Sequence, residues 1–90
     1  MRTKIMWVLT EVSNNQETHR YLRDTPIEWE TKFGGISPPD ELLTPYEIEA
    51  KAFQSEHEAL VFAQRHEMAV YGRGYQAETH LSPTQVLRQF

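Results

Sequence analysis

The feature that most restricts the fold of this chain is a run near its start that is apolar on both sides. Residues 4–12 are rich in β-branched and aromatic side chains, and alternate positions of a strand point to opposite faces. Both faces are then mostly apolar, with Ile5, Trp7 and Leu9 on one and Met6, Val8 and Val12 on the other. We therefore expect a central strand that the rest of the chain covers from two sides.

The size and composition of the chain indicate one ordinary globular domain over residues 1–90. Ninety residues provide one core, and the hydrophobic fraction of 39% and charged fraction of 24% are those of a folded protein. The absence of cysteine excludes a disulfide scaffold and thiolate chemistry, and it fits a cytoplasmic location. The first apolar run is too short for a signal peptide or a membrane span, so we expect no membrane partner.

The charge balance gives little support to a nucleic-acid partner. The 13 acidic residues exceed the 9 Lys and Arg residues, and no run of basic side chains is present to contact phosphates. The acidic residues are also interspersed with basic ones, which argues against a nucleic-acid mimic. We read the net charge of −4 mainly as a determinant of solubility.

The first half of the chain reads as strands and turns. Residues 13–16 predict a turn, because Asn tolerates left-handed backbone geometry, and residues 17–23 predict the second strand of a hairpin. Residues 27–33 alternate between apolar and charged side chains, as a third strand or an extended edge segment would. Two glycines and three prolines in residues 34–45 predict the main loop, and we expect it to be mobile.

The best-supported helix follows an ambiguous segment. Residues 44–53 carry both a helix-start signal and an apolar alternation, and we favour a strand. Ser55 and Glu58 form a capping box at the start of a predicted helix over residues 55–67. A helix with its own cap usually follows a non-helical residue, which is why the strand is preferred before it.

The remaining sequence predicts a strand and a short helix. Residues 68–81 read as a strand interrupted by two glycines. Ser82 and Pro83 then predict a C-terminal helix with an apolar stripe of Val86, Leu87 and Phe90. The predicted class is α+β, a small antiparallel or mixed sheet of three to five strands packed by one main helix, in the order β-β-(β)-β-α-β with the short helix last.

No combination of residues predicts a catalytic, cofactor or metal site. His57 and His66 lie on one helix but out of phase, and no HxxxH or HExxH spacing occurs. The serines occupy turn and cap positions, and the glycines lack the lysine of a phosphate-binding loop. We therefore predict a protein that is not an enzyme and needs no cofactor.

One cluster, residues 71–75, is a candidate for binding. In an extended strand Tyr71, Arg73 and Tyr75 share a face, and glycines leave the opposite face bare. Tyr and Arg are frequent at the centres of protein interfaces, although a structural ladder of aromatic residues paired to a Glu would use the same pattern. The predicted protein-binding residues are Tyr71, Arg73, Tyr75, Trp29 and Phe90.

The function indicated by these observations is a non-catalytic protein-binding module. We expect a small accessory, regulatory or inhibitory factor of the kind that phages and mobile elements encode, with an unidentified protein partner and a possible homodimer. The alternatives are a small enzyme or ligand binder that uses Glu30, His66 or Tyr75 in a pocket between sheet and helix, and a single-stranded nucleic-acid binder that uses the 71–75 cluster.

Overall fold

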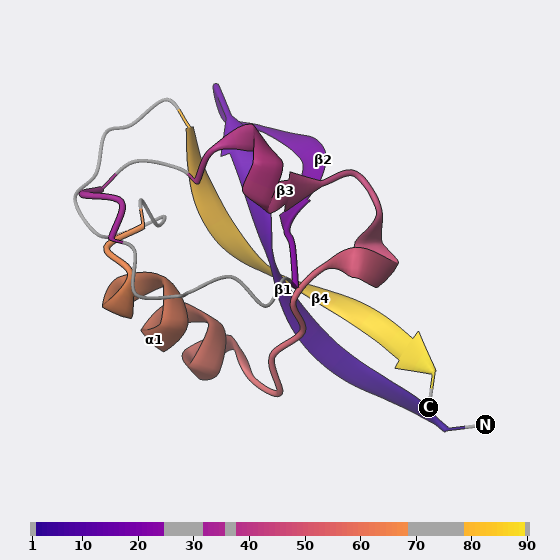
Figure 1. Cartoon of the computed structure of the whole chain (residues 1–90). Coiled ribbons are helices and arrows are strands. Elements are labelled where there is room, and N and C mark those ends of the chain that lie inside the picture. Colours follow the sequence, from indigo (N-terminus) through magenta and orange to yellow (C-terminus); the bar gives the residue numbers. More distant parts are fainter. Residues whose placement is uncertain (1, 25–31, 36–37, 69–78, 90) are drawn as a thin grey trace.

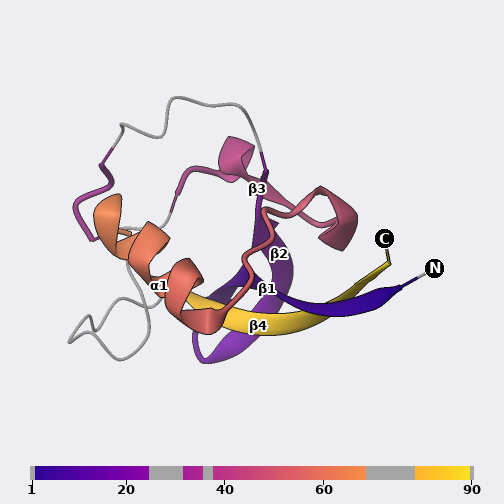
Figure 2. The ribbon, with the colours of Figure 1, turned by 90° about the horizontal axis from the view of Figure 1, so that it is seen from below.

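The computed structural model describes residues 2–24, 32–35, 38–68 and 79–89, and within them the chain forms an antiparallel four-stranded sheet with one α-helix (Figure 1, and from below in Figure 2). The strands are β1 (Thr3–Ser13), β2 (Gln16–Leu22), β3 (Leu43–Thr44) and β4 (Thr79–Gln89), and they lie in the order β3-β2-β1-β4. The helix α1 spans Glu56–Arg65, and two single 3-10 turns, η1 (Asp40–Leu42) and η2 (Glu47–Glu49), flank β3. The predicted α+β class is confirmed, although the order of strands matches only roughly.

The hairpin of β1 and β2 forms where the sequence predicts it. Ser13 pairs with Gln16, and the two asparagines between them have φ angles of 52° and 63°. Two left-handed residues in a row match the right-handed twist of the flanking strands, and Asn adopts that conformation readily. The register shifts after this turn, and His19, with a φ of 58°, lies in the bulge.

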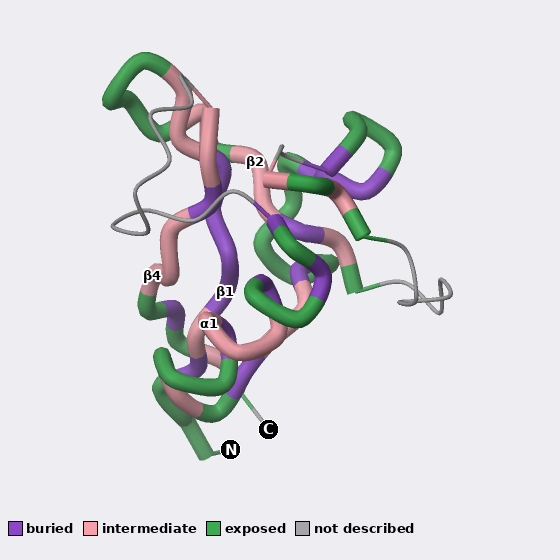
Figure 3. Tube along the Cα trace, turned by 90° about the vertical axis from the view of Figure 1, so that its left-hand side faces the viewer, coloured by how far each residue is buried: buried purple, intermediate pink, exposed green. Residues whose placement is uncertain are grey.

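The strand β1 is covered on both faces, as its two apolar faces require. Its Leu9 belongs to the larger core, which also contains side chains from β2, η1, β3, α1, β4 and the segments that flank α1: Leu22, Leu42, Leu43, Phe53, Ala59, Ala63, Met68 and Leu81. Its Met6 and Val8 belong to a second core on the opposite face, together with Ala50 and Val86. Burial is concentrated in the middle of β1, while the end of the strand near Thr3 is exposed (Figure 3).

The helix α1 begins at the predicted cap. The Ser55 Oγ accepts a hydrogen bond from the backbone N–H of Glu58 at 3.1 Å. The Glu58 carboxylate in turn accepts from the N–H of Gln54 at 3.0 Å, one residue before the position that the capping-box pattern predicts. Ala59 and Ala63 of this helix are buried and belong to the larger core.

The strand expected over residues 44–53 is wrong. The segment contains the turn η2, and only isolated bridges remain, from Ala50 to Arg23 and from Phe53 to Trp7. The turn is stabilised by Glu49, whose carboxylate accepts hydrogen bonds from the side chains of Thr44 and Arg23 at 3.0 Å each. These contacts need Glu49 to curl back toward β3, which an extended strand would prevent.

Part of the predicted loop over residues 34–45 has regular structure, because η1 and β3 lie within it. Leu42 and Leu43 are buried there, so this stretch supplies core as well as connection. The mobility of the loop stays a prediction.

The predicted C-terminal helix is also wrong, because Ser82 and Pro83 lie inside β4. This strand pairs with β1 without interruption, from Thr3 opposite Gln89 to Ser13 opposite Thr79, so β1 starts where β4 ends (Figure 1). A proline is tolerated in an outer strand when its missing N–H would face away from the neighbour. The long apolar β1 needs a partner along its whole length, and this requirement outweighs a helix-start signal of two residues.

Two further predicted strands fall mainly outside the described residues. Within 27–33 only Lys32 and Phe33 are described, and neither is in a strand; the Phe33 N–H donates to the His66 carbonyl at 2.9 Å. Within 68–81, Met68 is buried and residues 79–81 begin β4. None of the described helices has the length and hydropathy to cross a membrane.

Candidate protein-binding surface

The residues predicted to bind a partner lie outside the part of the chain that the structure describes. This applies to the whole set of Trp29, Tyr71, Arg73, Tyr75 and Phe90. The 71–75 cluster, as an interface or as a structural ladder, therefore stays a prediction. The surfaces considered below are those of the described residues.

The space between α1 and the sheet is packed with side chains where the structure describes it. Leu9, Ala63 and Leu81 have no measurable exposure there, and Met68 is 1% exposed. His66, one of the residues proposed for a ligand pocket, is buried, and its ring packs against the Phe62 ring at a tilt of 53°, with centroids 4.6 Å apart. In this region His66 contributes to packing. Glu30 and Tyr75, the other two residues considered for that pocket, are not described.

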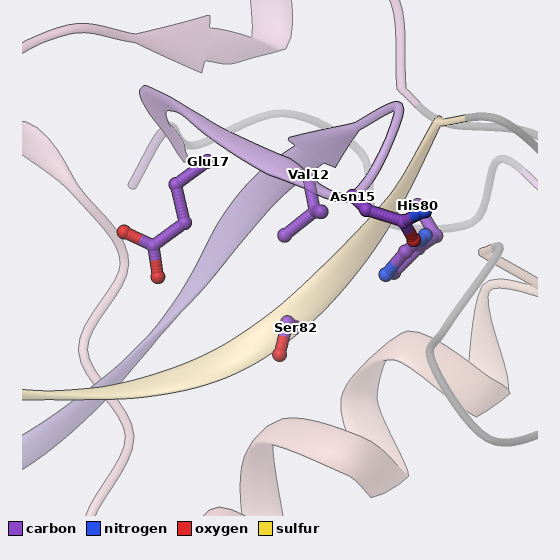
Figure 4. A pocket seen from close by; sticks show the side chains of 5 residues that line it. All are labelled: Val12, Asn15, Glu17, His80 and Ser82. Atoms are coloured by element: carbon purple, nitrogen blue, oxygen red, sulfur yellow. The ribbon is translucent and has the colours of Figure 1, made fainter.

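A hollow lies near the hairpin end of the sheet (Figure 4). Its volume is about 280 Å³, and it is lined by Val12, Asn15, Glu17, His80 and Ser82. Val12 pairs with Glu17 on one side and His80 on the other, so a strand separates the carboxylate from the imidazole. Figure 4 shows the Glu17 carboxylate directed away from His80 and Ser82, so these three groups do not form a serine–histidine–acid relay.

No group of three metal-ligating side chains occurs among the residues described. The charged side chains that do converge form a structural network. The Glu11 carboxylate is buried and accepts two hydrogen bonds from the Arg20 Nη2, at 2.7 and 3.0 Å, and one from the Thr18 hydroxyl at 2.8 Å. Arg20 also reaches Asp40 at 3.0 Å, and the hydrogen bonds to Glu11 first and Asp40 second raise the pKa of Arg20 above its ordinary value. This network joins β1, β2 and η1.

Another hollow lies between η2 and the far end of β4. We call it the η2–β4 groove. Its volume is about 790 Å³, and its lining residues are Met6, Glu47, Ile48, Ala52, Leu87, Arg88 and Gln89. Two of these are apolar and strongly exposed, Ile48 at 83% and Leu87 at 67%. Tyr46, 63% exposed, precedes η2, and Ile5, 52% exposed, pairs with Leu87.

Arg88 holds the two sides of this groove together. Its guanidinium donates to the backbone carbonyl of Glu47, to that of Ala50 at 3.2 Å and to that of Ile48 at 3.4 Å. Three carbonyls of one turn thereby bind one cation on the neighbouring strand, and a planar guanidinium suits this arrangement better than an ammonium does. The groove therefore has a fixed floor below its exposed apolar rim.

The sequence interpretation missed this surface. The sequence patterns predict Ile48 in a strand and Leu87 in the apolar stripe of a C-terminal helix, so they do not bring the two residues together. Residues 84–89 show no clear alternation of apolar and polar side chains, because Val86 and Leu87 are adjacent, and β4 is defined instead by its pairing with β1.

Comparison with known proteins yields no relative, since no family model matches the chain and no curated protein or solved structure is significantly similar to it.

Proposed function

We propose that this protein is a non-catalytic protein-binding module, an accessory or regulatory factor that acts through the η2–β4 groove. The observation that carries the proposal is the strong exposure of Ile48 and Leu87 on the rim of a hollow of about 790 Å³. Isolated exposed apolar residues are ordinary on protein surfaces, whereas a group of them around a concavity is typical of a binding site.

The physical properties of the groove suit a protein partner. Covering an exposed Ile or Leu side chain contributes about 1.5–3 kcal/mol for each residue, which favours association with an apolar surface of a partner. Tyr46 beside the groove adds an aromatic side chain of the kind enriched at the centres of interfaces. Because Arg88 fixes η2 in place, little ordering of the backbone is needed on binding.

Affinity purification from the source cell with three versions of the protein tests this proposal. We expect the wild type to retain a specific partner, and Ile48→Asp to lose it, because a carboxylate on the rim cannot be buried against an apolar surface. The matched control is Gln64→Asp, an exposed position on α1, which should retain the partner. Both variants should keep the wild-type circular dichroism spectrum.

A partner that binds Ile48→Asp as well as it binds the wild type would rule out the groove as its binding site. Turnover of a substrate by the purified protein would contradict the non-catalytic role.

A further inference from the structure

The outer edge of β4 is the edge that faces away from β1. The hydrogen bonds of Trp7 in β1 determine which backbone groups of β4 point toward this edge. The Trp7 N–H donates to the Phe53 carbonyl at 2.8 Å, and the Trp7 carbonyl accepts from the Phe53 N–H at 2.7 Å. Both groups of Trp7 therefore point away from β4, and Trp7 and Gln85 form a non-hydrogen-bonded pair. Since antiparallel pairs alternate, Gln85, Leu87 and Gln89 direct their N–H and C=O groups away from β1.

Pro83 belongs to the same outward-facing set. It pairs with Leu9, two residues along from Trp7, so its missing N–H falls on the outer edge and the ladder with β1 stays complete. Beyond Pro83, each outward-facing residue, Gln85, Leu87 and Gln89, has both a backbone N–H and a C=O group on this edge. No strand of the described chain pairs with this edge.

This stretch lacks the features that usually protect an edge strand. Proteins protect such edges with charged side chains, bulges or prolines. The only charge in residues 84–89 is Arg88, and its guanidinium is bound to η2. The ladder with β1 is regular, and the apolar side chains of Leu87 and Ile5 are exposed beside it.

We propose that a second copy of this chain adds its own β4 to this edge in antiparallel orientation, with the two-fold axis at Leu87. Leu87 then faces Leu87 of the second copy, and Gln85 faces Gln89. The two sheets join into one continuous sheet with the pair of β4 strands at its centre. This deepens the proposed function by naming one protein partner, and it uses the edge of β4 in addition to the groove.

The position of the axis follows from Pro83. With the axis at Leu87, the facing pairs on the new ladder all contain N–H groups and can exchange two hydrogen bonds each. An axis at Gln85 would place Leu87 opposite Pro83, which has no N–H to donate. The sequence of the edge therefore favours one register.

The side chains also suit a self-complementary contact. Ile5 and Leu87 are paired on one face, so the axis extends them into a row of four apolar side chains, two from each copy. Cross-strand apolar neighbours stabilise a sheet, and in this register no two like charges face each other. A pairing of five residues on each strand, 85–89, buries less than the roughly 800 Å² per partner of a stable interface, so we expect a dimer of micromolar affinity.

Sedimentation equilibrium over a concentration series tests the pairing. We expect the wild type to shift from one to two copies of a 10.6-kDa chain, and Leu87→Lys to weaken the dimer at least ~100-fold, because two ammonium groups would meet at the axis. Leu87 is exposed, so the variant should fold. Gln64→Lys, with the same charge change on α1, should dimerise like the wild type.

A cysteine variant tests the register, since the chain has no cysteine of its own. Cα atoms in a hydrogen-bonded antiparallel pair lie about 5.5 Å apart, within reach of a disulfide. We expect Leu87→Cys to form a covalent dimer under mild oxidation much faster than Gln64→Cys.

A wild type that stays monomeric throughout the series would overturn the inference, as would equal dimerisation of Leu87→Lys. A monomer whose edge instead binds an extended synthetic peptide would exclude the second copy as the partner. These outcomes are separate from a failure of the proposed function, because Ile48→Asp alters the groove and leaves the edge of β4 intact.

Discussion

Glu11 is a carboxylate that the fold buries, and Arg20 is the residue that compensates for its charge. The side chain of Glu11 is 5% exposed, whereas that of Arg20 is 36% exposed. We expect Arg20→Met to lower the free energy of unfolding by about 2 kcal/mol, because it leaves a buried carboxylate without its ion pair. The double variant Glu11→Met/Arg20→Met should recover much of this loss. Urea denaturation measures both values.

An equal loss for the single and the double variant would contradict this account.

The stabilising contribution of Arg20 depends on pH with a definite sign. Because the pKa of Arg20 is raised, its stabilising contribution is fully present below its unfolded-state pKa and is lost only as the pH rises beyond the folded value. The contribution of Arg20 is therefore constant near neutral pH.

Arg88 has a comparable effect at the other end of the sheet, through the carbonyls of η2. We expect Arg88→Ala to destabilise the protein by about 1–2 kcal/mol, since it removes charge-assisted hydrogen bonds. Hydrogen exchange at the Ala50 N–H, which bonds to the Glu47 carbonyl at 3.0 Å, should accelerate more than exchange in α1. Arg65→Ala, on the exposed side of α1, is the control and should leave that exchange rate unchanged.

At the scale of the element, the alternation of N–H directions in β4 predicts that proline substitutions at two adjacent positions differ strongly in their effect on stability. Thr84 pairs with Val8 and directs its N–H toward β1, whereas Gln85 directs its N–H outward. We expect Thr84→Pro to destabilise the protein by about 3 kcal/mol and Gln85→Pro to have a much smaller effect. Thermal unfolding of both variants measures the difference. Similar losses at the two positions would show that the alternation in β4 is assigned incorrectly.

The individual elements differ in how far the sequence predicts them. β1, the Asn14–Asn15 turn and the Ser55 cap are specified by neighbouring residues, and the structure confirms them. The errors at residues 44–53 and 82–90 have a common cause, because there local signals compete with partners far along the chain. For this reason the sequence patterns predict Leu87 in a helix, and they indicate neither the η2–β4 groove nor the free edge of β4.

At the scale of the whole molecule, the longest strand pair joins segments that are distant in sequence. Even at its nearest end, the hydrogen bond between the side chains of Ser13 and Thr79 spans 66 residues. A loop of this length must close before β1 gains its partner, and such topologies fold slowly. We expect folding in milliseconds to seconds, measured by stopped-flow fluorescence of the tryptophans. Folding in microseconds would contradict the idea that the pairing of β1 with β4 limits the rate of folding.

The same pairing determines how the molecule responds to a pulling force. Because Thr3 lies opposite Gln89, tension applied at these two positions acts across the ladder rather than along it. The hydrogen bonds between β1 and β4 are perpendicular to the strands, so each pair is loaded in turn and opens before the next one bears any load. The domain therefore unzips from this end under weak tension, even though the middle of β1 is the most deeply buried part of the chain.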